Sequence, residues 1–89
     1  MTTIHNKYKE PYDIYIGRGS IFGNPWVIGT HGTRDEVIDR YEEYFAEKLN
    51  SDPAFKAAVL GAKGKKLGCF CKPLRCHGDV ICNYLNQLK

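Results

Sequence analysis

The sequence lacks any long apolar run. Its uncharged apolar stretches are far too short to cross a bilayer, and the start MTTIHNKYKE contains no apolar signal segment. This pattern predicts a cytosolic (cytoplasmic) protein that makes no membrane contact. Because thiols stay reduced in the cytosol, the four cysteines do not predict stable disulfides.

Internal repeats, low-complexity tracts and linkers are also missing. The 89 residues therefore predict one domain, residues 1–89. Hydrophobic residues make up 43% of the chain and aromatic residues 12%, which is enough for one modest core. A core this small gains from a bound metal or a dimer interface, so a monomer and a homodimer are both consistent with the sequence.

Acidic residues are absent from residues 53–78, although residues 34–52 contain seven of them. The acid-free segment carries six basic residues: Lys56, Lys63, Lys65, Lys66, Lys72 and Arg75. Such a positive field suits an anionic ligand. The alternative is a solvated surface strip without a partner.

Hydrophobic periodicity predicts strands at residues 12–17, 26–29 and 66–71 and helices at 34–49, from 53, and at 79–89. Thr33 and Glu36 form the pattern of a capping box, and Asp52 followed by Pro53 begins the second helix. In that helix the residues expected to face inward are Phe55, Val59 and Leu60. The order predicts a small α/β domain, a two-layer or three-layer sandwich with a short, mainly parallel sheet and about three helices.

The stretch GCFCKPLRCHGD, residues 68–79, concentrates three of the four cysteines beside a histidine and an aspartate. One interpretation is a zinc site made by Cys69, Cys71, Cys76 and His77. The spacing disfavours it, because usual structural zinc patterns use C-x2-C pairs and adjacent Cys-His chelates awkwardly. Zinc is therefore the alternative cofactor rather than an assigned one.

A second interpretation makes the same stretch a reactive or ligand-binding site. A cysteine at a helix start near basic residues has its thiolate stabilised, and a histidine can move a proton near neutral pH. The candidate catalytic residues are Cys71, Cys76, His77 and Asp79, and Lys72 and Arg75 are candidate anion ligands. The third interpretation is purely structural, and it is preferred for Cys82, which falls within the last predicted helix.

The segment GRGSIFGNP, residues 17–25, resembles no complete phosphate-binding fingerprint. Its glycines would nevertheless let a ligand approach the backbone, and Arg18 offers a planar donor for phosphate or carboxylate. The candidate ligand-binding residues here are Arg18, Gly19, Ser20 and Asn24. A plain turn between two strands is the alternative, and Trp26 is expected in the core.

Three motifs in order, YIGRGSIFGNPWVIG, GTRDEVIDRYEEYF and KKLGCFCKPLRCHGDVI, resemble a family of phages and bacteria described only as domain of unknown function 4326. The resemblance covers about residues 12–86. It implies that the signature positions of the family are occupied here by Arg18, Asn24, Cys69, Cys71, Cys76, His77 and Asp79. It implies no activity, and Cys82 is not a signature position.

The leading hypothesis is a small phage-type accessory domain that binds, and could process, an anionic small molecule such as a nucleotide or nucleoside derivative. The pocket would lie between the glycine loop and the cysteine-histidine loop, because both follow predicted strands. The alternative is a zinc-stabilised module that binds nucleic acid or a host protein without catalysis.

Overall fold

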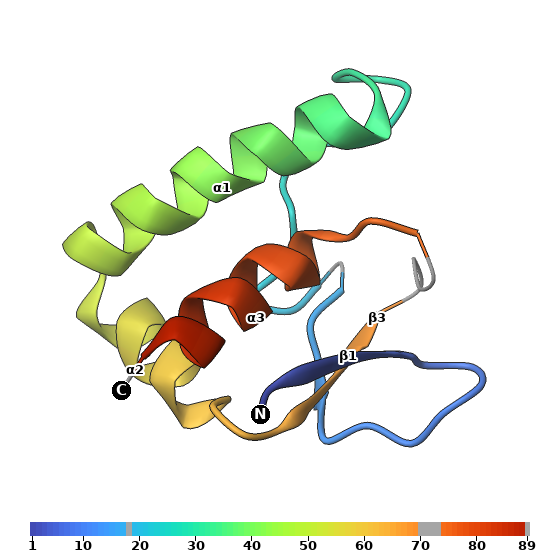
Figure 1. Cartoon of the computed structure of the whole chain (residues 1–89). Coiled ribbons are helices and arrows are strands. Elements are labelled where there is room, and N and C mark those ends of the chain that lie inside the picture. The colour runs from blue at the N-terminus through green and yellow to red at the C-terminus, as the bar shows by residue number, and fades with distance from the viewer. Residues whose placement is uncertain (18, 70–73, 89) are drawn as a thin grey trace.

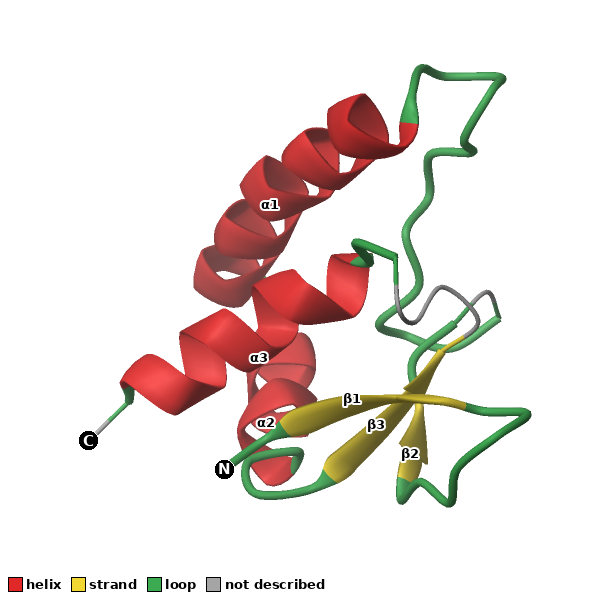
Figure 2. Ribbon diagram, turned by 45° about the vertical axis from the view of Figure 1, so that its right-hand side comes forward, coloured by secondary structure: helices red, strands yellow, loops and turns green. Residues whose placement is uncertain are grey.

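The structure is a computed structural model that describes residues 1–17, 19–69 and 74–88. Its elements are β1 (Thr3–Asn6), β2 (Ile14–Tyr15), α1 (Arg34–Ser51), α2 (Pro53–Gly61), β3 (Lys66–Cys69) and α3 (His77–Gln87). The three strands form one parallel sheet, and the three helices lie on one side of it (Figures 1 and 2). The predicted α/β class is confirmed, in its two-layer form.

β3 is the central strand, with β1 on one side and β2 on the other. Ile4 of β1 and Ile14 of β2 both stand in register with Leu67 of β3. Residues in register on parallel strands point to the same face, and this row turns toward the helices. Leu67 is fully buried and Ile4 nearly so, which shows that this face of the sheet carries the core.

α1 and α2 begin where the local signals predict, whereas α3 begins at His77 instead of residue 79. Thr33 Oγ1 accepts from the backbone N–H of Glu36 and the Glu36 carboxylate accepts from the Thr33 N–H, so α1 starts with a complete capping box. Asp52 caps α2 in the same way, by accepting from the N–H of Phe55. Their apolar stripes pack together through the rings of Phe45 and Phe55, whose centroids lie 5.8 Å apart.

Several sequence predictions about the elements were wrong or incomplete. Residues 26–29 form bends and turns instead of a strand, and β1 was not predicted at all. Leu60 is 42% exposed, because only Phe55 and Val59 of α2 face the core. The first predicted strand is shorter than expected, since only Ile14–Tyr15 of residues 12–17 pair with β3.

Close packing between α3 and the sheet depends on Gly78. A Cβ atom added there would lie 2.5 Å from the Cδ1 atoms of both Ile4 and Ile16. Only a residue without a side chain lets the first turn of α3 approach the sheet this closely. The start of α3 is therefore held directly against the ends of the strands, where the predicted loops meet.

Candidate functional site

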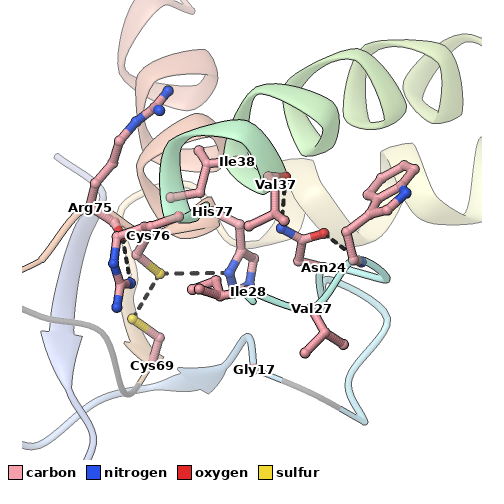
Figure 3. A pocket seen from close by; sticks show the side chains of 12 residues that line it. Gly17, Asn24, Val27, Ile28, Val37, Ile38, Cys69, Arg75, Cys76 and His77 are labelled. Carbon is pink, nitrogen blue, oxygen red and sulfur yellow. Dashed lines mark hydrogen bonds between the residues drawn. The ribbon is translucent and has the colours of Figure 1, made fainter. Parts of the chain in front are cut away.

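A cleft of about 240 Å³ opens where the chain after β2 passes the starts of α1 and α3 (Figure 3). The glycine loop contributes Gly17 and Asn24, and the cysteine-histidine segment contributes Cys69, Arg75, Cys76 and His77. The two segments predicted to converge do so. The rest of the described wall consists of Arg34 and five apolar side chains: Trp26, Val27, Ile28, Val37 and Ile38.

His77 is held in one tautomer. Its Nε2 lies 2.7 Å from the carbonyl oxygen of Ile16, which can only accept, so Nε2 carries the proton. The imidazole also packs edge-on against Tyr41, with centroids 5.1 Å apart. Nδ1 is thereby directed to the other side of the ring, 3.7 Å from Cys76 Sγ. A base held by a third group and facing a thiol is the arrangement that activates a cysteine.

Cys76 sits at the residue before α3 and caps that helix. Its Sγ accepts from the Gly78 N–H at 3.3 Å, and the Asp79 carboxylate accepts from the Cys76 N–H at 3.0 Å. Together they form a capping box in which a thiol replaces the usual hydroxyl. The helix start favours the thiolate form of a sulfur at this position. Asp79 thus acts on Cys76 through the backbone and does not line the cleft.

Cys69, at the end of β3, faces Cys76 across the base of the cleft. Their sulfur atoms lie 2.9 Å apart and both side chains are about 1% exposed (Figure 3). Cys82 is buried within α3, as its structural interpretation predicts. No group of three or more histidine, cysteine or acidic side chains in the described part of the chain is placed to hold a metal. Cys71, the fourth residue of the zinc hypothesis, lies outside the described residues.

The guanidinium of Arg75 forms ion pairs within the protein. It binds Asp35 Oδ1 at 2.9 Å and Asp39 Oδ1 at 3.0 Å, and these bonds raise its pKa. The side chain therefore joins the segment before α3 to the first turns of α1. This bridging role differs from the anion-binding role that the sequence suggests for Arg75, although the residue does line the cleft.

Arg34 is the cleft cation that sequence reasoning missed. It is half-buried and lines the cleft, and its Nη1 donates to the carbonyl oxygen of Arg75 at 3.0 Å. One sign of it was available in the sequence. A cation at the first position of a helix opposes the helix dipole, so a residue placed there costs stability unless it has another role.

The remaining predicted ligand-binding residues differ in where the structure places them. Asn24 lines the cleft and anchors it, because its amide donates to the Val37 carbonyl at 3.1 Å and accepts from the Trp26 N–H at 3.0 Å. Ser20 closes the turn by donating to the Gly17 carbonyl, and neither it nor Gly19 is among the described residues of the cleft wall. Arg18 and Lys72 lie outside the described residues.

Tyr41 supports this wall from beneath. Its hydroxyl donates to the Phe22 carbonyl at 2.8 Å, and burial raises its pKa, with further contributions from Tyr44 and Cys76. The phenol therefore remains a donor throughout the physiological range. Trp26, predicted in the core, is instead half-buried at the cleft, with its ring edge-on to Tyr44 at 5.6 Å.

Residues 2–87 match the family described as "Domain of unknown function (DUF4326)". The chain belongs to this family. The resemblance seen in three motifs is thus confirmed over nearly the whole chain. The DUF4326 chain is also 39% identical over 83 residues to the "Uncharacterized 12.4 kDa protein in nrdA-td intergenic region" of Enterobacteria phage T4.

That alignment covers 93% of this chain and 76% of the phage protein. No solved structure matches the chain. No helix among the described residues of this DUF4326 domain is long and apolar enough to span a membrane. Neither description names an activity, so the function has to be argued from the cleft.

Proposed function

We propose that the cleft binds an anionic small molecule with a planar apolar body, such as a nucleotide or a nucleoside derivative. The observation that carries this proposal is the composition of the cleft wall. Apolar side chains, among them Trp26, Val27 and Ile28, line the same space as the guanidinium of Arg34. Ligand sites commonly combine an apolar wall with a few polar groups that orient the ligand.

Arg34 and the N-terminal ends of α1 and α3 are the proposed anion-binding groups. α1 and α3 both begin at the cleft, so the positive ends of two helix dipoles face it. Capping carboxylates on Glu36 and Asp79 partly balance these dipoles. Arg34 uses one N–H on a backbone carbonyl, and a guanidinium has five, so it retains the capacity for a bidentate contact. Arg18, Gly19, Ser20 and Lys72 remain proposed contributors from the two flanking loops.

Cys76 and His77 form the proposed reactive pair. The thiol proton would pass to His77 Nδ1, giving a thiolate and an imidazolium whose Nε2–H stays bound to the Ile16 carbonyl. Cys69 and Asp79 support Cys76 from its two sides, and Cys71 is a further proposed nucleophile. We propose binding as the function, and catalysis by this pair as its extension.

Trp26 provides the test, because it is the one tryptophan of the chain and it lines the cleft. Its fluorescence is to be followed while nucleoside monophosphates, and the matching uncharged nucleosides, are titrated into the full chain. We expect a saturable change for at least one monophosphate and a much weaker response to its nucleoside. Arg34→Gln should weaken binding by about ten-fold or more, the usual effect of losing a charge-assisted contact.

Arg40→Gln is the matched control, since Arg40 is exposed on the same helix and away from the cleft wall. Equal affinities of the Arg34→Gln and Arg40→Gln variants would contradict the assignment of the anion. The absence of any response at millimolar nucleotide would contradict the function itself. Metal analysis of protein purified without chelator tests the alternative of a structural zinc site. Stoichiometric zinc together with unreactive thiols would contradict the proposal that Cys76 and His77 are a reactive pair.

A further inference from the structure

The face of the sheet that turns away from the helices is distinct from the cleft. Side chains alternate along a strand, so His5 and Gly68, which follow the buried Ile4 and Leu67 in register, point to this outer face. Tyr15 of β2 stands in register with Gly68 and shares the face. Figure 2 shows all three helices on the opposite side, so no described helix covers it.

Tyrosine rings lie over this face, and glycines make room for two of them. A Cβ added at Gly68 would lie 2.5 Å from Cγ of Tyr12, so the Tyr12 ring rests directly on the Gly68 backbone. The ring of Tyr15 lies over Gly17 in the same manner. Tyr12 is still 38% exposed and Tyr8 is 75% exposed. Tyr8 lies in the turn after β1 and adjoins these rings through Lys7, and we call Tyr8, Tyr12 and Tyr15 the tyrosine face.

One lysine contacts the tyrosine face, and three more lie in the same segments of the chain. Lys7 Nζ lies 5.3 Å from the centroid of the Tyr8 ring and 4.7 Å from that of Tyr15. Exposed Lys65 and Lys66 stand at the start of β3, and Lys9 is exposed in the turn after β1. Lys7 and Lys9 belong to residues 7–15, which also contain the three tyrosines. Lys65 and Lys66 belong to residues 65–68, which end at the glycine beneath Tyr12.

The acids of this region are both engaged within the protein. Glu10 pairs with His5, which in turn contacts Thr3 Oγ1 at 2.7 Å. Asp13 Oδ2 accepts from the Lys66 N–H at 2.9 Å and fixes the approach to β2. Four lysines stand against these two acids in the described part of the region, so its net charge is positive.

We propose that the tyrosine face binds single-stranded nucleic acid, with bases stacked on the tyrosine rings and phosphates paired with these lysines. Rings that rest on a glycine backbone are already ordered, so stacking costs them little further entropy. The exposed rings of Tyr8 and Tyr12, with cations nearby, suit unpaired bases, whereas the paired bases of a duplex present no face for stacking. This surface lies on the opposite side of the sheet from the helices, and the proposal is independent of the ligand bound in the cleft.

The test is a fluorescence-anisotropy titration of the full chain with labelled oligothymidylate and oligouridylate of about twelve nucleotides, within the usual range of single-strand sites. We expect saturable binding of at least one strand that weakens steeply with salt, and much weaker binding of a duplex of equal length. Tyr8→Ala should weaken binding by about ten-fold, which is the usual effect of removing one stacked ring. Comparison of the two strands tells a DNA partner from an RNA partner.

Matched controls lie on α2. Lys66→Ala should reduce the affinity and the salt dependence, whereas Lys56→Ala, an exposed lysine on α2, should leave both unchanged. Leu60→Ala controls for the loss of an exposed apolar side chain. Because Tyr8 is largely exposed, Tyr8→Ala is expected to fold normally, and thermal unfolding checks this. Absence of binding at low salt, duplex bound as tightly as single strand, or equal losses in the face and control variants would each overturn the proposal.

Discussion

His77 Nε2 donates to the carbonyl oxygen of Ile16 at 2.7 Å and thereby joins the first residue of α3 to the residue after β2. The partners are 61 positions apart in the sequence. The contact fixes the imidazole against Tyr41 and sets which nitrogen faces Cys76. It is therefore both a structural link and the element that orients the proposed reactive pair.

Replacing His77 with alanine should lower the free energy of unfolding by roughly 1–3 kcal/mol, because the Ile16 carbonyl loses its donor in a largely buried place. Urea unfolding followed by circular dichroism measures this. A His31→Ala variant provides the comparison, because it removes only an exposed bond, from the Val27 N–H to His31 Nδ1. If both variants unfold at the same urea concentration, the bond to Ile16 contributes no more to stability than that exposed bond.

The tautomer of His77 is a separate prediction. In a ¹⁵N–¹H spectrum of the imidazole groups, at a pH where they are neutral, His77 should carry its proton on Nε2. His5 is an internal reference of the opposite type, because its Nδ1 faces the Glu10 carboxylate and its Nε2 faces Thr3 Oγ1. A proton on Nδ1 of His77 would exclude this nitrogen as the base for Cys76.

Gly78→Ala should destabilise the domain by roughly 1–3 kcal/mol, the usual cost of forcing extra volume into a packed interior. The added methyl would press on Ile4 and Ile16, so α3 must move away from the sheet. Gly61→Ala is the matched control, since a Cβ at the last residue of α2 meets nothing within 4 Å. Thermal unfolding should separate the two, and a neutral Gly78→Ala would show that the helix start is not tightly packed.

The bridge from Arg75 to α1 should be weak but measurable. Its three side chains are 39% to 77% exposed, so we expect a coupling between Arg75 and Asp39 of about 0.5–1 kcal/mol in a double-mutant cycle. The coupling should shrink as salt is added. Glu43, an exposed acid on the same helix, replaces Asp39 in the control cycle, where a coupling of equal size would indicate only a general charge effect.

The α1 cap predicts a dependence of stability on pH. The backbone N–H of Thr33, then its side chain, lower the pKa of Glu36 below the ordinary value of 4.5. A carboxyl group with a lowered pKa stabilises the folded state above its unfolded pKa, and this contribution disappears as the pH falls through the folded value. The melting temperature of the wild-type chain should therefore fall more below pH 4.5 than that of Glu36→Gln, whose amide can still accept from the cap. Parallel curves for the two chains would contradict this.

The helices could be predicted because their signals are local. Thr33 with Glu36, and Asp52 with Pro53, mark helix starts through contacts within one turn, so no knowledge of the fold is needed. The convergence of the two loops also followed from a general rule about strand ends. The sequence therefore predicted which two segments of the chain come together.

The strands were harder to predict, because pairing partners lie far apart. β1 is four residues long and contains a single buried residue, Ile4, so it has too little alternation to be recognised. Residues 26–29 are apolar for a different reason than the one inferred. Trp26, Val27 and Ile28 line the cleft, so their apolar character reflects the cleft wall and not a buried strand.

The roles of the polar cleft residues required the structure. The side-chain chemistry of Arg75 and Asn24 predicts ligand contacts, but the bonds that these residues make depend on where α1 lies. The unfavourable position of Arg34 against the helix dipole indicates some further role, but that Arg34 lines the cleft is visible only in the structure. Charge and hydrogen-bonding capacity are visible in a sequence, whereas the choice between ligand and protein partner is made by tertiary contacts.

The central position of β3 has a consequence for the order of events during synthesis. β1 and β2 leave the ribosome first, but among the described strands each pairs only with β3, whose residues 66–69 are made much later. β1 and β2 therefore stay unpaired while α1 and α2, which lie between β2 and β3 in the sequence, are synthesised. Sheet assembly is therefore a single late step, in which β3 pairs with both earlier strands. A pause in translation before residue 66 would leave the backbone groups of β1 and β2 unpaired and exposed to other chains.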